Sequence, residues 1–422
     1  MWLTTVNSRI IVAAHMTAFA SMEEARLFLS GEIDRPSHVA HSDLPDGIAL
    51  DMQSYELGGG SFTNSYDIQY EANTHQARVL VHEELQSVAS SLKDEHKVAI
   101  SGGFFFLADR ASAQPRQKAL NLAISDGTIR SLPVVDRETL LCRDGRLSVR
   151  QLRAIGNLTL NGTELTWAGS LTDHEADCRV YANANAVVTH EFSARNGSER
   201  VLHEASRYTP PIMNDGTVDL GVRYDAHSGA FSSLQASERG RVDIFDHDFV
   251  LRVPARYCSL QESNSAVIRS VDTEIIDSEL QGALSVGPLL SEADYTAHPI
   301  NHDLSLGAKP PFTNRRMARL VLYMTQDNTT HLRLFDGRPD SSCFAGVTPT
   351  EAAQIVQAES AVRWGCFLDP GQTAKMYVQD AANGVRMNFG NRHYLQWPMH
   401  EDEPYTWVPD TGRPVASAIV LS

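Results

Sequence analysis

Cysteine is scarce in this sequence, and its spacing argues against two kinds of stabilising scaffold. The chain has five cysteines and no C-x-x-C pair, so neither a structural zinc site nor a dense disulfide framework is expected. We expect each to be a small buried hydrophobic residue, and a reducing, cytoplasmic location is the simplest interpretation. An exported protein with one or two bridges is the alternative. The five are Cys142, Cys178, Cys258, Cys343 and Cys366.

Basic residues are in deficit, and long apolar runs are missing. Lys and Arg total 36 against 52 Asp and Glu, for a formal net charge of -16. Nucleic-acid binding without sequence preference needs a field of Lys and Arg, so no nucleic-acid partner is expected. A local pocket of arginines could still bind a small anion. No window approaches the length of a membrane span.

The beginning of the chain has two interpretations. Arg9 and the apolar residues after it loosely resemble a signal peptide, although His15 interrupts the apolar stretch. The favoured alternative is a strand over residues 9–16, followed by a helix over residues 21–30 that begins with a capping box.

Internal repeats, low-complexity tracts and long linkers are also absent. Helical periodicity is limited to residues 21–30, 82–92 and 348–362, whereas short β-rich runs recur between Asn-Gly and Asp-Gly pairs that suit hairpin turns. We therefore predict an α+β fold of largely antiparallel or mixed sheet with a few packed helices. The β-rich runs cover residues 98–100, 158–167, 186–192, 249–253, 319–324 and 332–335, and the turn pairs begin at Asp126, Asp144, Asn161 and Asn196.

Signatures of phosphate loops and metal sites are missing. Gly58-Gly59-Gly60 lacks the spacing of a dinucleotide fingerprint, so a tight turn explains it better. His38-Val39-Ala40-His41 and Asp246-His247-Asp248 offer ligand residue types, but neither has a third partner at a recognisable interval. No Gly-x-Ser-x-Gly elbow motivates a Ser-His-Asp triad. No metal or cofactor is expected.

Two segments could bring a ligand close to the backbone or to a cation. In residues 98–106 an apolar strand runs into Gly102-Gly103 and an aromatic cluster, which could let backbone N–H groups and rings approach a sugar. A buried strand ending in a bulge explains this segment equally well. Asp336-Gly337-Arg338 follows another strand and places an acid beside a guanidinium that could grip phosphate oxygens. Its alternative is a surface turn with an exposed ion pair.

A third segment delivers Asp369 into a Pro-Gly turn after an expected strand. Hydrolysis at an anomeric carbon passes through an oxocarbenium-like state that a nearby carboxylate stabilises or attacks. Because a phosphate monoester leaves as a weakly basic anion, arginines can replace much of the usual general-acid help. A type II turn explains the same residues without chemistry.

The order of these segments resembles the phosphodiester glycosidase family. Members show Asn-Gly-Gly-Phe-Phe, Gly-Pro-Leu-Leu, Arg-Thr-Ala, Asp-Gly-Arg, Ser-x-Gly-x-Thr, Leu-Asp-Gly-Gly-Gly-Ser-Ser and Arg-Pro-Val-Ala-Asn-Ala in that order. Each string alone is weak evidence for the family. The resemblance depends on their shared order at compatible spacing, from about Val98 to the C-terminus. The similar strings here are Ser101 to Phe105, Gly287 to Leu290, Arg316 to Ala318, Asp336 to Arg338, Phe344 to Thr348, Leu368 to Thr373, and Arg413 to Ala418.

The resemblance implies a hydrolase that cleaves a glycosyl-1-phosphodiester at the anomeric carbon. It implies that Arg316 and Arg338 neutralise phosphate charge, that Asp369 acts at the anomeric carbon or activates water, and that Asp336 positions Arg338 or a hydroxyl. The sequence departs from the family at Ser101, Met317, Pro370, Gln372 and Thr373, so an altered substrate or reaction is the leading interpretation. The substrate contacts implied are Ser101, Gly102, Gly103, Phe104, Gly346, Thr348, Gly371, Gln372 and Thr373.

Two other functions stay open. A non-catalytic protein could keep the fold to bind a sugar phosphate or glycan, and an enzyme of another class could handle a nucleotide or a natural-product intermediate in the same pocket. A small molecule is the expected partner, and the oligomeric state is not set by the sequence. We expect a catalytic domain over residues 98–422, with an N-terminal elaboration over residues 1–97 packed on it.

Overall fold

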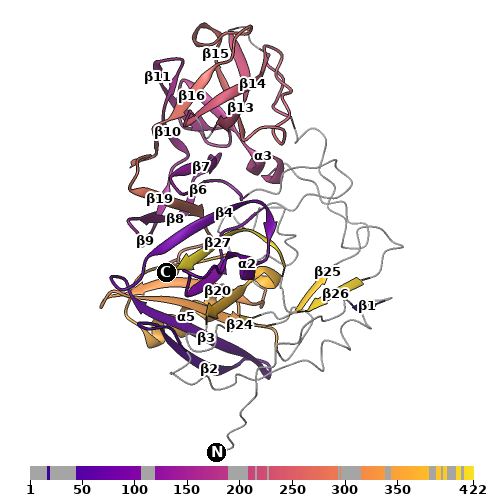
Figure 1. Cartoon of the computed structure of the whole chain (residues 1–422). Helices are drawn as coiled ribbons and strands as arrows, with labels where there is room; N and C mark the ends of the chain where they lie inside the picture. Colours follow the sequence, from indigo (N-terminus) through magenta and orange to yellow (C-terminus); the bar gives the residue numbers. More distant parts are fainter. Residues whose placement is uncertain are drawn as a thin grey trace, which may run out of the picture.

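The protein is mostly β, with several antiparallel sheets and a closed seven-stranded barrel (Figure 1). The expected antiparallel sheet is confirmed, since all the described ladders are antiparallel except β11 with β12. Helices are short in the described ranges: α2 (Val88–Ser91), α3 (Asn183–Val188) and α5 (Pro349–Glu359). A computed structural model describes residues 17–19, 44–105, 119–188, 208–213, 216–225, 228–292, 295, 315–337, 344–379, 386–390, 393–396, 405–409 and 413–422.

Two five-stranded sheets pack face to face in the lower part of Figure 1. Leu332 and Leu334 of the first sheet share one buried cluster with Ile100, Met376 and Ile419 of the second, because alternate residues of each strand point to the same face. The first sheet has the order β2 (Ala49–Leu57), β3 (Ser61–Glu71), β21 (Thr329–Asp336), β20 (Arg319–Thr325), β22 (Val362–Phe367). The second has the order β24 (Arg386–Gly390), β23 (Lys375–Gln379), β5 (Val98–Ser101), β27 (Val415–Leu421), β4 (Ala77–Gln86).

A third sheet connects this sandwich to the barrel, which lies at the top of Figure 1 and is inserted between β9 and β19. The barrel interior is filled by apolar side chains around Trp167, whose Nε1 donates to Ser270 O over 3.2 Å. The third sheet has the order β7 (Thr128–Ser131), β6 (Ala123–Ser125), β19 (Leu280–Ser285), β8 (Arg137–Arg143), β9 (Arg146–Leu152). The barrel has the order β10 (Ile155–Leu160), β11 (Thr163–Gly169), β12 (Cys178–Tyr181), β15 (Phe249–Pro254), β13 (Thr217–Asp225), β14 (Ala230–Ser237), β16 (Ser265–Ile268).

Strands from the first hundred residues complete the sandwich. β3 pairs with β21, and β4 pairs with β27, so the early strands share ladders with late ones. Strand pairing therefore does not separate residues 1–97 from residues 98–422. The division of the chain into these two parts stays a prediction. The smaller elements are β1 (Thr17–Phe19), β26 (Tyr405–Pro409), β25 (His393–Gln396), β17 (Ser270–Val271), β18 (Glu274–Ile275) and the 3-10 turns η2 (Ala255–Tyr257) and η7 (Gly371–Thr373).

The hairpin turns expected from Asp-Gly and Asn-Gly pairs are confirmed where the chain is described. Asp126, Asp144 and Asn161 have φ values of 51°, 48° and 48°, and the glycine after each also has a positive φ. Two successive positive φ values define the turn that matches the twist of paired strands. The glycines at 58–60 form the β2–β3 turn, as expected. The pair at Asn196 lies outside the described residues.

Three predicted elements differ from the structure. Residues 82–86 belong to β4 rather than to a helix, because pairing with β27 overrides local periodicity, and α2 begins only after the cap at Ser87. Residues 186–188 lie in α3 rather than in a strand. The run over residues 158–167 is two strands, β10 and β11, joined by a turn at Asn161. The predicted elements at 9–16 and 21–30 lie outside the described residues.

The helix predicted near residue 348 is confirmed. Thr348 caps α5, and its side chain and that of Glu351 form a reciprocal capping box. The helix ends at Glu359 because Val362 already belongs to β22.

The cysteines with described surroundings are free: Cys142, Cys178 and Cys366 are buried and Cys258 is half-buried. No helix of the described chain is long and apolar enough to cross a membrane.

The contact between the barrel and β17 is tested by Gly156→Ala. A Cβ at Gly156 would lie 2.0 Å from Ser270 O and 2.8 Å from Trp167 Nε1, both buried. We expect a loss of about 1–3 kcal/mol in the free energy of unfolding, measured with urea. The control is Gly58→Ala, whose Cβ meets only the end of the Arg316 side chain at 3.8 Å. Equal stability of the two variants would contradict this packing.

Candidate functional site

Loops from both sheets of the sandwich meet around Asp369. β22 of the first sheet ends at Phe367, and β5 of the second ends at Ser101. The Asp369 N–H donates to the Gly102 carbonyl over 3.1 Å, and the Gly371 N–H donates to the Ala318 carbonyl over 2.7 Å. The segments singled out in the sequence at Gly102 and at Asp369 are therefore neighbours in space.

Two more of the segments singled out in the sequence reach the same region, where backbone atoms approach glycines closely. A Cβ at Gly337 would lie 2.0 Å from Gly346 N, and one at Gly346 would lie 2.3 Å from Met317 O. An added Cβ at Gly371, where φ is +78°, would lie 3.9 Å from the Met317 sulfur. Four chain segments thus converge on one region: those after β21, before β20, before α5 and after β22. They can approach so closely because glycines at the contact points have no side chain.

The Asp369 carboxyl has a pKa near neutrality. Its residue is 8% exposed. Burial raises the pKa from its ordinary value of 3.8 to about 7, against the opposing effects of a hydrogen bond from Thr373 and the charges of Arg413 and Arg137. A carboxyl that titrates near pH 7 is suited to accepting and donating protons under physiological conditions.

The sequence did not identify the two arginines that act on Asp369. Arg137 begins β8 of the third sheet, donates from Nε to Val286 O over 3.2 Å, and places its guanidinium 5.0 Å from the centroid of the Phe104 ring. Arg413 precedes β27 and opens the last of the family-like strings. That string offered a signal for Arg413, whereas no motif surrounds Arg137.

Ser101 and Thr373 hold the turn that carries Asp369. The Ser101 hydroxyl donates to the Thr373 carbonyl and accepts a bond of 3.0 Å from the Lys375 N–H. The Thr373 hydroxyl lies 2.8 Å from the Pro370 carbonyl and within hydrogen-bond reach of the Asp369 carboxyl. These two predicted substrate contacts are buried and bond to the protein itself, so we assign them a positioning role. Gln372, which precedes Thr373, is half-buried.

The paired glycines near Ser101 also bond within the protein. The Gly102 N–H donates to the Ser417 carbonyl over 3.0 Å, and the Gly103 N–H donates to the Ser417 hydroxyl over 3.1 Å. Phe104, predicted to contact substrate, is buried with its ring against Arg137. Thr348 is used as the cap of α5.

Arg316 contacts an acid other than Asp369. Its Nε lies 3.0 and 3.1 Å from the two carboxyl oxygens of Glu351, and its Nη1 donates to Gly58 O over 2.9 Å and to Ser61 Oγ. Arg316 therefore clamps the β2–β3 turn to the first turn of α5, and its role on phosphate stays a prediction. Asp336 Oδ1 accepts a bond of 2.8 Å from the Gly337 N–H. Arg338 lies outside the described residues.

In the described ranges, no group of three or more His, Cys, Asp or Glu is placed to hold a metal ion. His247 donates from Nδ1 to the Asp243 carbonyl over 2.7 Å, and the Asp248 carboxylate accepts a bond of 2.8 Å from the Tyr224 N–H. His247 therefore bonds within its own turn and Asp248 bonds to strand β13, while residues 38–41 lie outside the described chain.

Solved structures with a similar fold exist. A hypothetical protein from Synechocystis matches at a TM-score of 0.51 and 16% identity, over 89% of this chain and 62% of its own. A putative exported protein from Burkholderia pseudomallei matches at a TM-score of 0.50 and 17% identity, over 85% of this chain and 74% of its own. The three proteins share a fold. The chain spans less than two thirds of the Synechocystis protein.

A more distant similarity is to the catalytic domain of zebrafish N-acetylglucosamine-1-phosphodiester alpha-N-acetylglucosaminidase, auto-inhibited by its pro-peptide. It has a TM-score of 0.37 and 13% identity, over 90% of this chain and 85% of that one. No family model and no curated protein matches the sequence.

The raised pKa of Asp369 predicts a pH dependence of stability. Between about pH 4 and pH 7 the folded state keeps a proton that the unfolded state has lost, so stability falls as pH rises through this window. We expect this component to reach about 4 kcal/mol at most and to be missing in Asp369→Asn. Urea unfolding of both proteins from pH 4 to pH 8 measures it. Parallel curves would contradict the raised pKa.

Proposed function

We propose that the protein is a hydrolase that acts on a glycosyl phosphodiester, or a close chemical relative, at the anomeric carbon. The observation that carries the proposal is a buried carboxyl of near-neutral pKa, Asp369, whose pKa is lowered in part by the charges of Arg137 and Arg413. This combination supports acid–base chemistry on an anionic substrate, because one group exchanges protons while the other two attract phosphate oxygens.

Each arginine suits the anion in a different way. Arg137 is braced by the Phe104 ring and the Val286 carbonyl, so its planar fork is held in one orientation. Arg413 lies two residues before β27 of the second sheet. Two guanidiniums on separate elements stabilise the phosphate charge that develops during the reaction.

Asp369 acts in this proposal at the sugar carbon or on the attacking water. Above its pKa the carboxylate accepts a proton from water or stabilises positive charge on the sugar ring. The Ser101 and Thr373 hydrogen bonds fix the backbone turn that presents it. Arg338 and Asp336 stay in the proposal as further phosphate and hydroxyl contacts, implied by the family resemblance.

Release of sugar from a panel of glycosyl-1-phosphodiesters tests this reaction. We expect Asp369→Asn to lower the rate by about 10²–10⁴, because a carboxamide cannot exchange the proton. The matched control is Asp126→Asn in the exposed β6–β7 turn, where Asn tolerates the positive φ of 51°. Calorimetric binding of the same compounds without turnover would favour the sugar-phosphate receptor, and neither binding nor turnover would reject both.

The charge of Arg413 is predicted to shift the pH profile of the reaction. Removing it by Arg413→Gln takes away one of the two cations that lower the Asp369 pKa. We expect the acidic limb of the rate profile to move upward by about one pH unit and KM to rise. A variant that loses activity with an unchanged pH profile would show that Arg413 does not act on Asp369.

A further inference from the structure

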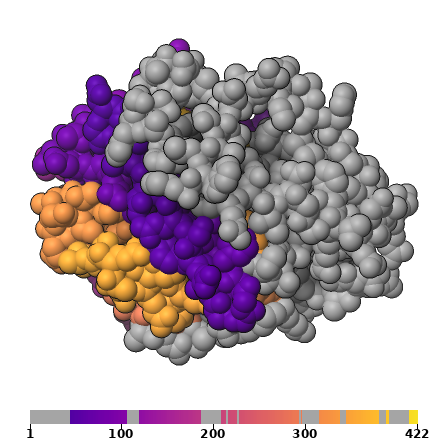
Figure 2. Space-filling view, turned by 90° about the horizontal axis from the view of Figure 1, so that it is seen from below, coloured from indigo at the N-terminus to yellow at the C-terminus, as the bar shows by residue number. Residues whose placement is uncertain are grey.

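The outer strand of the first sheet offers an open edge. β2 spans nine residues and pairs along its whole length with β3, without a bulge. On its other side it pairs with no strand of the described chain. Seen from below, residues coloured indigo form a band on the surface (Figure 2). Such a row of unpaired N–H and C=O groups is a template for an added strand.

This edge lacks the common protections and carries charge of one sign. β2 contains no proline and no lysine, which are the residues that usually prevent pairing at an edge. From Leu44 to Thr74 the sequence has acids at five positions and no Lys, Arg or His. Asp51 and Glu56, both on β2, are exposed. A cationic strand would be attracted to this edge, and an acidic one would be repelled.

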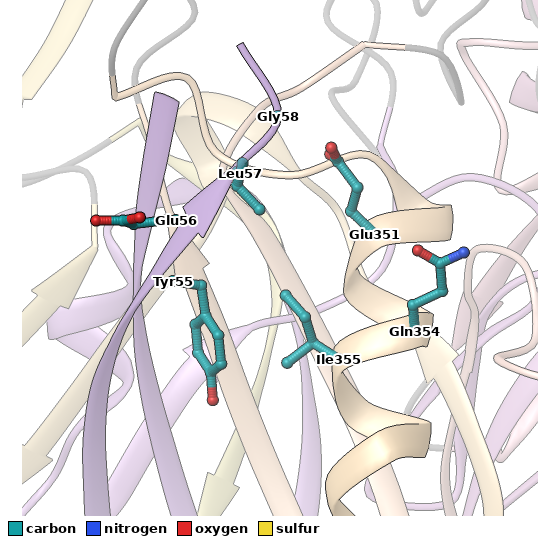
Figure 3. Close-up of a pocket in the computed structure, with 7 residues that line it drawn as sticks. All are labelled: Tyr55, Glu56, Leu57, Gly58, Glu351, Gln354 and Ile355. Atoms are coloured by element: carbon teal, nitrogen blue, oxygen red, sulfur yellow. The ribbon is translucent and has the colours of Figure 1, made fainter. Parts of the chain in front are cut away.

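A groove runs beside the end of β2 on the side that faces α5 (Figure 3). Its volume is about 270 Å³. Tyr55 and Leu57 point toward the helix, while Glu56 points away from it, as alternation along a strand requires. Leu57, Ile355 and the Tyr55 ring supply apolar surface, and Glu351 lies at one end. The groove is smaller than the roughly 300–1,000 Å³ of most small-molecule pockets, so its size suits a single side chain.

The walls of the groove are fixed by hydrogen bonds. The Tyr55 hydroxyl donates to Glu359 Oε1 over 2.6 Å and accepts a bond from Arg333. At the other end Arg316 links Glu351 to the Gly58 carbonyl. A ligand would meet a formed groove rather than pay for ordering it.

We propose that β2 binds an extended, basic segment of a partner polypeptide as an additional strand of the first sheet. Backbone hydrogen bonds along β2 supply the affinity, and alternate side chains of the partner supply the selectivity. An apolar side chain of the partner lies in the groove against Leu57 and Ile355, because Glu351 is already paired with Arg316. Residues on the opposite face of the added strand meet Glu56.

The charges favour a different polypeptide over a second copy of this chain. Pairing of β2 with a second copy of itself would offer no cation to Asp51 or Glu56, since neither strand has one. The proposal does not rest on the proposed function, because it uses no group that acts on Asp369.

A nine-residue peptide of alternating lysine and valine, matched to the length of β2, tests the proposal. Fluorescence anisotropy of the labelled peptide with the full chain measures affinity, and a glutamate–valine peptide is the comparison. We expect at least about tenfold tighter binding of the lysine peptide, a loss of about tenfold in Asp51→Lys/Glu56→Lys, and a smaller loss in Glu56→Lys. Asp46→Lys is the control, since Asp46 is exposed but outside the strand.

Amide hydrogen exchange separates strand addition from nonspecific charge attraction. Binding of the lysine peptide is expected to slow exchange at residues 49–57. Equal affinity for the two peptides, no binding at millimolar peptide, or protection only outside β2 would overturn the proposal. Protection of β2 that rises with protein concentration alone would assign the edge to a second copy, and would overturn it as well.

Discussion

The hydrogen bond from the Asp369 N–H to the Gly102 carbonyl joins the strand ends of two sheets, and the candidate site depends on it. Each sheet is completed separately, and this bond brings the segment after β22 of the first sheet against the segment after β5 of the second. It also fixes where the Asp369 carboxyl lies, under cover of both sheets. Its burial raises the pKa more than Thr373 and the two arginines lower it. The chemistry proposed for Asp369 is thus a consequence of how the sandwich closes.

Some arginines of the described chain hold the backbone around α5, and two others lower the pKa of Asp369. Arg319 is fully buried and donates to the Val347 and Arg315 carbonyls over 2.8 Å each, and burial lowers its pKa to about 9. Arg316 serves Glu351 and the β2–β3 turn. Both stabilise the chain entering β20 against the start of α5. The charges that reach Asp369 come instead from Arg137 and Arg413, on the third and second sheets.

This division explains what the sequence could and could not predict. The hairpin turns and the α5 cap were predictable, because their causes lie within four consecutive residues. Gly102 and Asp369 were both singled out in the sequence, but their contact is seen only in the structure. The effect of Arg137 on Asp369 could not be predicted from the sequence, because the two residues are brought together by contacts between segments distant in sequence. The pairing of Arg316 with Glu351 joins residues 35 positions apart, so only the packing of α5 reveals it. The helix expected over residues 82–92 failed for the same kind of reason, because β27 lies far along the chain.

A near-neutral carboxyl beside two arginines has a consequence for how an anionic substrate would bind. A phosphate entering the site brings negative charge toward Asp369, which raises the carboxyl pKa and favours its protonated form. The guanidiniums of Arg137 and Arg413 oppose that rise, because each phosphate oxygen they hold is screened from the carboxylate. Without them, the bound substrate would itself remove the base that the reaction needs. The arginines therefore act twice in the proposed chemistry, once on the substrate and once in keeping Asp369 ionised when the substrate is present.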